Sequence, residues 1–324
     1  IVDVGFCELQ TEPRLKISRP WLLPFFSKFM NEYLKFDIEM IVSLLIVLSI
    51  IIGIANNRMN SIGVRILNRW ARWVCVSVGL AFFVHQMDWA ARPFWTLAII
   101  FFLCWLLLET LYTWLAINAM SQSALALFPR FRNNSTGEEW PAQRKMIELR
   151  DWLKAKNFNK RQALVAELGG GITLRSSIYQ NENGSIRTQI LFLPRPNGTI
   201  NHCVSFTSET SENERLITDN LNTPYGGFYP GNWNVSRKPW TRSPEKLLKH
   251  HLKRIQELEL EEYEIDPVDD INRQQGVLER INIEAGFLVP PHLQDEMGRI
   301  TWEGRYRVWK EVWLLNYFGI AGKG

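Results

Sequence analysis

The sequence predicts an α-helical membrane region with three transmembrane helices, followed by a soluble α+β domain whose antiparallel β-meander is flanked by helices. Two observations support this prediction. Residues 94–120 form an almost continuously apolar run that is long enough to cross a bilayer as a helix, with Glu109 as its one charged side chain. The chain after residue 131 instead alternates charged and apolar residues, as a water-exposed domain does.

Strongly apolar sequence is confined to one part of the chain, which the average composition hides. The mean hydropathy of −0.12 is that of a soluble protein, yet nearly all the long apolar runs fall between residues 38 and 120. We therefore divide the chain into an N-terminal extracytoplasmic or interfacial segment (1–37), a three-helix transmembrane region (38–132) and a soluble α+β domain (133–324).

The first span is predicted at residues 41–55, which are continuously apolar. Asp37 and Glu39 precede this run and Arg58 follows it, so the run is short but sufficient for a thin crossing. Just before it, residues 25–36 interleave large apolar residues with charged ones. They form either a helix lying in the membrane interface or a loop and helix cap packed on the spans.

The second span is predicted at residues 73–84, a weaker run bounded by aromatic residues. Trp70 and Trp73 at one end and Trp89 at the other are typical of the side chains that lie at a membrane interface. The link to the third span, residues 88–93, is so short that the second and third spans must form a tight antiparallel hairpin.

The positions of the basic residues predict the orientation. One set lies between the first two spans and another follows the third, so both sets fall on one side of a three-span protein, which is then the cytoplasmic side. These residues are Arg58, Arg65, Arg69, Arg72, Arg130 and Arg132. We expect an integral protein of a bacterial inner (plasma) membrane, with its N-terminus outside and its C-terminal domain in the cytoplasm. A re-entrant second segment would instead put the two sets on opposite faces.

The soluble domain opens with helical patterns and continues with alternating ones. Residues 142–156 place apolar residues at helical spacing, and residues 160–168 are predicted as a second short helix that ends at Gly169. Four later runs alternate with period two and are separated by turn formers, which predicts an antiparallel meander of three or four strands. These runs are residues 172–179, 185–193, 200–207 and 215–219.

The rest of the domain is predicted as an aromatic loop followed by helices. Residues 221–240 combine prolines and glycines with large rings, which is typical of an ordered loop. A helix is predicted at residues 243–263, where a serine followed by a proline forms a typical start. Further helices are predicted at residues 268–285 and 303–318.

Glu109 is the first candidate for a functional residue, because a carboxylate inside an apolar span is costly unless it is protonated or hydrogen-bonded. It could handle protons or ions, or it could be a polar lock that faces another helix. The lack of a second acid in the spans favours the lock. His85 and Arg92 are conceivable partners, and we name Glu109 and His85 as the intramembrane polar candidates.

Five rings of the aromatic loop are the candidates for a binding interface. They are Tyr225, Phe228, Tyr229, Trp233 and Trp240. Rings of this size must be buried either against the domain's own sheet or against a partner. Their density resembles that of an interface cluster, so we favour a partner.

Motifs for other chemistry are missing or incomplete in the sequence. The four cysteines are far apart and no CxxC motif occurs, which argues against a disulfide framework, a structural zinc site or covalent haem. His250 and His251 are adjacent and therefore cannot chelate one metal in the usual i, i+4 manner. The net charge of +4 comes from basic residues mixed with nearly as many acids, which is weak support for nucleic-acid binding. We predict no metal and no cofactor.

These observations favour a non-catalytic integral-membrane accessory or scaffolding subunit of a larger membrane protein complex. It would dock on other membrane proteins through its helices and its cytoplasmic α+β domain, with membrane lipid around the helices. The alternative is a membrane enzyme or transporter that uses Glu109 in proton or ion handling. A membrane-tethered regulator that binds nucleic acid ranks last, and we expect no nucleic-acid partner.

Overall fold

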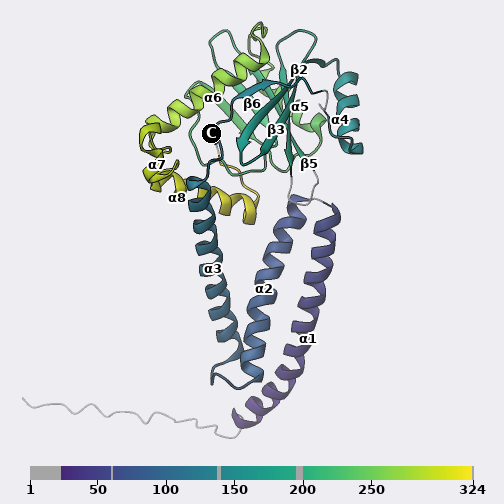
Figure 1. Cartoon of the computed structure of the whole chain (residues 1–324). Helices are drawn as coiled ribbons and strands as arrows, with labels where there is room; N and C mark the ends of the chain where they lie inside the picture. Colours follow the sequence, from purple (N-terminus) through teal and green to yellow (C-terminus); the bar gives the residue numbers. More distant parts are fainter. Residues whose placement is uncertain (1–22, 60, 137–139, 195–199, 323–324) are drawn as a thin grey trace, which may run out of the picture.

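Figure 1 shows the computed structural model of the chain, in which the long helices stand side by side and a sheet domain lies at one end of them. The structure describes residues 23–59, 61–136, 140–194 and 200–322, with side chains from residue 38 onward. The long helices are α1 (Leu23–Met59), α2 (Ile62–Gln86) and α3 (Phe94–Gln122). The end of α1, the start of α2 and the end of α3 face the sheet domain.

Two of the three long helices are long and apolar enough to cross a membrane. The segments are Ile38–Met59 of α1 and Phe94–Gln122 of α3. The predicted second span lies in the second half of α2, and α2 falls short because Arg65, Arg69 and Arg72 occupy its first half. The described part of the chain therefore holds two candidate spans where the sequence predicts three.

The long helices pack through a small apolar core at the end far from the sheet domain. It consists of Ile38, Val42, Val78, Ala81, Phe94, Leu97 and Ala98. The faces that point away from this core are also apolar, and Leu44 and Leu107 are 67% and 68% exposed. An apolar surface of this extent needs a cover other than water. The backbone of residues 25–36 continues without a break into α1, and their side chains lie outside the described part.

The sheet has seven strands in the order of the sequence. The first six are antiparallel to their neighbours, as in the predicted meander, whereas β7 runs parallel to β6, so the sheet is mixed. The strands are β1 (Phe131–Asn133), β2 (Asn159–Gly169), β3 (Ile172–Gln180), β4 (Arg187–Pro194), β5 (Ile200–Glu209), β6 (Arg215–Asp219) and β7 (Trp233–Arg237). β7 lies inside the segment predicted as an aromatic loop. The loop before it is long enough to carry the chain back for a parallel pairing.

Helices cover both faces of the sheet. α4 (Arg144–Ala155) and α5 (Pro244–Ile255) pack on one face, around the fully buried Leu153, Phe206 and Leu247. α6 (Pro267–Glu284) packs on the other face, where its Ile271 meets residues of β2 and β3. α5 ends before the predicted residue 263, because the chain after it pairs with the end of β5: the N–H of Glu261 donates to the carbonyl oxygen of Glu209 at 2.9 Å.

The segment predicted as a short helix, residues 160–168, is strand β2. Its Leu164 and Ala166 are buried in the apolar cluster beneath α6, which requires the alternation of a strand. Gly169, with φ of 99°, begins the turn to β3 instead of ending a helix. A Cβ at this glycine would lie 2.8 Å from the carbonyl oxygen of Ala124. Tertiary packing therefore overrides a local pattern that fits either structure.

The C-terminal segment lies across the end of α3 (Figure 1). It comprises the short η1 (Pro291–Leu293) and α7 (Gln294–Met297), then α8 (Trp302–Trp313) and the π-helical turn η2 (Leu314–Phe318). α8 and η2 together occupy the segment predicted as one helix. Ile117 of α3 shares a buried apolar cluster with Ile300 and Val308. The long helices and the sheet domain therefore meet in a common core.

Candidate functional site between the helices and the sheet domain

α8 and η2 fill the space between the long helices and the sheet domain, and we call this region the junction. Hydrogen bonds fix the end of α3 to it. The N–H of Ile300 donates to the Ser121 hydroxyl at 3.0 Å, and Nη1 of Arg305 donates to Oδ1 of Asn118 at 2.7 Å. Glu109 and the aromatic loop, which the sequence singles out, both lie at this junction.

Glu109 lies on α3, where side chains from two other elements reach it. Its Oε1 accepts a hydrogen bond from the Tyr317 hydroxyl of η2 at 2.9 Å and lies 4.0 Å from Nη1 of Arg69 on α2. The Glu109 and Arg69 side chains are both partly exposed. The carboxylate is therefore held by a hydroxyl and a nearby cation, which reduces the cost of placing it on an apolar helix.

The structure does not bring Glu109 and His85 together. The His85 ring packs against Phe94, with centroids 6.2 Å apart, and the link that carries Arg92 lies at that same far end of the helices (Figure 1). Sequence reasoning misses Arg69 and Tyr317 because both are remote from Glu109 along the chain. Of these two residues, only Arg69 could be identified from the sequence as a neighbour of Glu109. It lies one helical turn before Trp73, and the short link between α2 and α3 places these two helices side by side.

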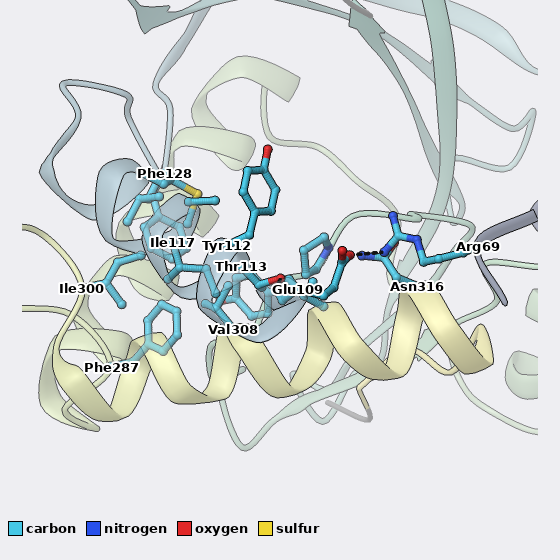
Figure 2. A pocket seen from close by; sticks show the side chains of 16 residues that line it. Arg69, Glu109, Tyr112, Thr113, Ile117, Phe128, Phe287, Ile300, Val308 and Asn316 are labelled. Carbon is cyan, nitrogen blue, oxygen red and sulfur yellow. Dashed lines mark hydrogen bonds and ion pairs between the residues drawn. The ribbon is translucent and has the colours of Figure 1, made fainter. Parts of the chain in front are cut away.

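Glu109 lines a pocket of about 390 Å³ between α3, α8, η2 and the loop after β6. Figure 2 shows a gradient of polarity along this pocket: the Glu109–Arg69 pair lies at one end, and Ile117, Phe287 and Ile300 lie at the other. The volume falls within the range of small-molecule pockets, about 300–1,000 Å³. Such a lining suits a ligand with one polar and one apolar end.

A cluster of aromatic rings attaches η2 to α2. Trp73 is buried and packs edge-on against Tyr317 and Trp313, with centroids 5.1 and 5.7 Å apart. Trp70 donates its indole N–H to the carbonyl oxygen of Tyr317 at 3.1 Å. The Arg69 guanidinium lies 5.0 Å from the centroid of the Tyr317 ring. The two tryptophans that the sequence predicts at a membrane interface therefore also hold the C-terminal turn.

The structure places the candidate rings of the aromatic loop against the protein's own elements. Asn282 of α6 donates to the Tyr225 hydroxyl at 3.0 Å, and the Arg307 guanidinium of α8 lies 3.8 Å from the centroid of the Phe228 ring. Trp240 remains 53% exposed, although its indole N–H donates to the carbonyl oxygen of Gly319 at 2.7 Å. The role of these rings in binding a partner stays a prediction.

Tyr229 and Trp233 continue the same row of rings. The Tyr229 centroid lies 4.9 Å from that of Tyr225 and 6.5 Å from that of Trp233. Burial raises the pKa of both tyrosines, so their hydroxyls stay protonated at neutral pH. Trp233 also lies under the Arg215 guanidinium, 5.5 Å from the ring centroid.

A buried ion pair joins the sheet to α8. Arg237 at the end of β7 pairs with Glu311, and both side chains are almost fully buried. The other carboxylate oxygen of Glu311 accepts a hydrogen bond from the N–H of Gly226 at 2.5 Å. Removing one partner of such a pair leaves the other charge buried alone, which is strongly destabilising. The pair therefore fixes α8 relative to the sheet.

A separate ionic cluster lies inside the sheet domain. Asp270 of α6 accepts hydrogen bonds from Arg187 on β4 at 2.6 Å and from Arg215 on β6 at 2.9 Å. Burial alone would raise the pKa of Asp270, but the charges of the two arginines outweigh it and hold that pKa below its usual value. The cluster attaches α6 to two strands.

Ser208 and His251 form a contact that is closed to solvent. Ser208 Oγ lies 3.1 Å from Nε2 of His251, and Thr218 Oγ1 lies 3.0 Å from Nδ1. Both Ser208 and His251 are fully buried, and burial lowers the pKa of His251 to about 3. This contact therefore fixes α5 on the sheet and offers no access to a substrate. Within the described residues, no three His, Cys, Asp or Glu side chains gather as metal ligands.

Comparisons of the chain with protein-family models, with curated proteins and with solved structures found no match. The junction has two features that bear on function: the attachment of α8 and η2 to both parts of the molecule, and the pocket beside Glu109.

Proposed function

We propose that the protein is a non-catalytic integral-membrane accessory or scaffolding subunit of a larger membrane complex. Its sheet domain is held at a fixed position on the bilayer surface and docks on neighbouring membrane proteins. The observation that carries this proposal is the double attachment of the C-terminal segment, to the sheet through Glu311 and to the long helices through Tyr317. Such an attachment restricts motion between the two parts, which suits a subunit that positions others.

The proposal includes a crossing of the bilayer by all three long helices. α2 packs along both α1 and α3. Its arginines lie in the half next to the sheet domain, where Arg69 approaches Glu109 and Arg65 meets Asn222 of the domain. Arginines at the end of a span lie at the interface instead of in the hydrocarbon. With this arginine-rich end on the cytoplasmic side, the sheet domain is cytoplasmic and the N-terminus is outside.

Aromatic rings around α8 mark the proposed level of the bilayer surface. Trp302 is 74% exposed, and its ring stacks on that of Trp114 of α3 with centroids 4.9 Å apart. One turn later, the exposed Tyr306 stacks on Trp309 at 5.8 Å. Tryptophan and tyrosine gather at membrane interfaces because each combines an apolar ring with a polar group. α8 accordingly lies along the membrane surface beneath the sheet domain.

Purification in a mild detergent tests the subunit role. We expect other membrane proteins to co-purify in fixed stoichiometry. Replacing both partners of the buried pair, Arg237→Ala with Glu311→Ala, should lower their recovery, because α8 is no longer fixed to the sheet. The matched control removes the exposed pair on β1 and β2, Arg132→Ala with Glu167→Ala, and should leave recovery unchanged. A protein that purifies alone with a bound small ligand would contradict the proposal.

Thiol labelling in intact cells tests the orientation. Ser211 is exposed in the turn between β5 and β6, so Ser211→Cys in a background without the native cysteines provides an accessible probe. A membrane-impermeant reagent should label it only after the cells are permeabilised. Labelling of intact cells would place the sheet domain outside.

A second candidate function is a membrane enzyme or transporter that uses Glu109 in proton or ion handling. Its support is the placement of Glu109 on a pocket of about 390 Å³ next to Arg69. The variant Glu109→Gln keeps the size and hydrogen bonding of the side chain but removes its charge. Loss of a transport or catalytic activity with unchanged assembly would favour this candidate over the subunit role.

A further inference from the structure

A second cavity, which we call the turn cavity, lies beside the first turns of α2. Its volume is about 630 Å³. Parts of the chain that are far apart in sequence contribute to it: the first turns of α2, helix α4, the start of β5 and the segment just before α5. Its lining shares no residue with the pocket beside Glu109.

Positive charge is concentrated in the turn cavity. Arg65 of α2, Lys145 of α4 and Arg242 of the segment before α5 all line it. The lining contains one carboxylate, Glu148, which is already engaged by Arg144 at 2.9 Å. Cations from three separate elements therefore outnumber the acid, and the cavity attracts anions.

Neutral polar groups complete the lining and orient the charges. With its amide oxygen turned toward Arg65, Asn222 places that oxygen 2.9 Å from both terminal nitrogens of the guanidinium. Burial, and then the charge of Lys145, lower the pKa of His202, so that its ring is a neutral hydrogen-bonding group at pH 7. Asn201 adds a further amide to the wall.

The turn cavity lies at the end of the first candidate span. Arg242 donates a hydrogen bond at 3.3 Å to the carbonyl oxygen of Met59, the last residue of that span. Ile62, in the first turn of α2, and Met146 of α4 supply apolar parts of the wall. Where α1 crosses a bilayer, this position is at the level of the lipid headgroups.

We propose that the turn cavity binds the phosphate group of an anionic phospholipid headgroup. Arginine presents a fork of N–H donors that fits phosphate oxygens, and lysine adds a compact charge. Basic pockets beside membrane helices on the cytoplasmic side are typical sites for anionic lipid headgroups. The lipid as the source of the phosphate rests on the proposed crossing of α1, whereas phosphate binding by these residues does not.

Binding of defined lipids to the full-length protein tests this proposal. The purified protein in detergent is incubated with phosphatidylglycerol or phosphatidylcholine, and the bound lipid is counted by native mass spectrometry. The wild-type protein should prefer phosphatidylglycerol. The double variant Lys145→Ala, Arg242→Ala should lose about fivefold in affinity for each basic residue removed, and on the order of thirtyfold in total.

A second double variant separates the site from general charge. Lys154→Ala with Lys253→Ala removes two exposed cations outside the cavity lining, one from α4, which also carries Lys145, and one from α5, which follows Arg242 in the chain. This control should bind phosphatidylglycerol as the wild type does. Lys145 and Arg242 are exposed as well, so neither substitution disturbs the core, which unfolding curves of both double variants will verify.

Inorganic phosphate serves as the probe for a soluble source. Phosphate should compete with phosphatidylglycerol for the wild-type protein but not for the Lys145→Ala, Arg242→Ala variant, and this result would support the site. Phosphate binding without retention of phosphatidylglycerol would keep the phosphate site but reject the lipid as its source. Equal phosphatidylglycerol binding by both double variants, or no preference over phosphatidylcholine together with no phosphate binding, would overturn the proposal.

Discussion

The ionic cluster around Asp270 inside the sheet domain and the pair of Glu109 with Arg69 at the junction both join a carboxylate to guanidinium groups, but in different surroundings. Asp270 is 1% exposed and accepts hydrogen bonds from two buried arginines, whereas Glu109 lies 4.0 Å from one arginine and lines a pocket. A buried charge that loses its partners cannot be hydrated instead, whereas a partly exposed charge can form hydrogen bonds with water. Loss of Asp270 is therefore expected to destabilise the fold, whereas the Glu109 carboxylate is partly exposed and lines a pocket.

The largest expected effect is that of Asp270→Ala, which, among the described residues, leaves Arg187 buried without a carboxylate partner and Arg215 with Glu209 alone. We expect a loss of about 3–5 kcal/mol in the free energy of unfolding of the sheet domain. Urea unfolding of the full chain in detergent measures it. The control Glu279→Ala removes an acid of the same helix whose pair with Arg130 is exposed, and should cost less than about 1 kcal/mol. Equal losses would abolish the distinction between enclosed and exposed pairs.

Glu311→Gln should have the next largest effect, because it weakens the bonds to Arg237 and Gly226 that fix α8. Hydrogen bonds to a charged group contribute about 1.5–3 kcal/mol each, and we expect a loss in this range. Hydrogen exchange should rise in α8 and η2 while β3 to β5 keep their protection. Glu303→Gln, an exposed acid of the same helix, should change neither. Uniformly faster exchange across the sheet would show that the junction and the domain unfold as one unit.

A third difference between enclosed and exposed groups lies in the dependence of stability on pH. The folded-state pKa of His251 is about 3, well below its usual value of 6.5. As the pH falls below 6.5, the unfolded chain therefore binds a proton that the folded chain does not, and stability decreases. His251 alone contributes a loss of about 1.4 kcal/mol per pH unit, hence about 2 kcal/mol between pH 6.5 and 5. Burial raises the pKa of Asp219 to about 6, which contributes in the opposite direction below pH 6, so the contribution of His251 is the difference between the slopes of the wild type and a His251 variant.

His251→Gln should remove this contribution, so that its stability falls less, or rises more, than that of the wild type as the pH decreases, whatever its effect on stability at pH 7. The adjacent His250 is exposed, so His250→Gln should keep the slope of the wild type. Unfolding curves recorded between pH 7 and pH 5 give both slopes. A variant at His251 that retained the full slope would assign the pH dependence to other groups.

Glu109→Gln should have the smallest effect on stability. The amide preserves the hydrogen bond from Tyr317, and the partly exposed contact with Arg69 contributes at most about 1 kcal/mol. Thermal unfolding in detergent measures the change, and Glu109→Leu tests the need for any polar group. A loss as large as that of Asp270→Ala would mean that Glu109 supports the fold to the same extent.

The parts of the fold that follow from the sequence are those in which local pattern and packing agree. β3 to β6 alternate with period two and are separated by turn formers, and the apolar run of α3 has no rival interpretation as a strand. The prediction for β2 is wrong because its run of residues fits a helix and a strand equally, and burial against the sheet's apolar cluster decides between them. The sequence does not predict β7 because its pairing with β6 is parallel, so no hairpin turn precedes it as a signal.

The candidate site was only partly accessible to sequence reasoning. Glu109 stands out because it is the one acid in an apolar run, yet its neighbours Arg69 and Tyr317 come from helices that only the folded chain brings together. The rings of the aromatic loop stand out by composition alone. Composition does not show which surface covers a ring, and the contact between Arg307 and Phe228 depends on where α8 lies.

The π-helical turn η2 makes the C-terminal contacts sensitive to chain length. In a regular α-helix each residue advances the side-chain direction by about 100°. The wider turn over Leu314–Phe318 holds one residue more than an α-helical turn would, and it brings Tyr317 under Trp313 with centroids 4.4 Å apart. Deleting one residue there would restore a regular helix and rotate every later side chain by that angle. The reach of the Tyr317 hydroxyl to Glu109 is therefore set by a single residue of chain length.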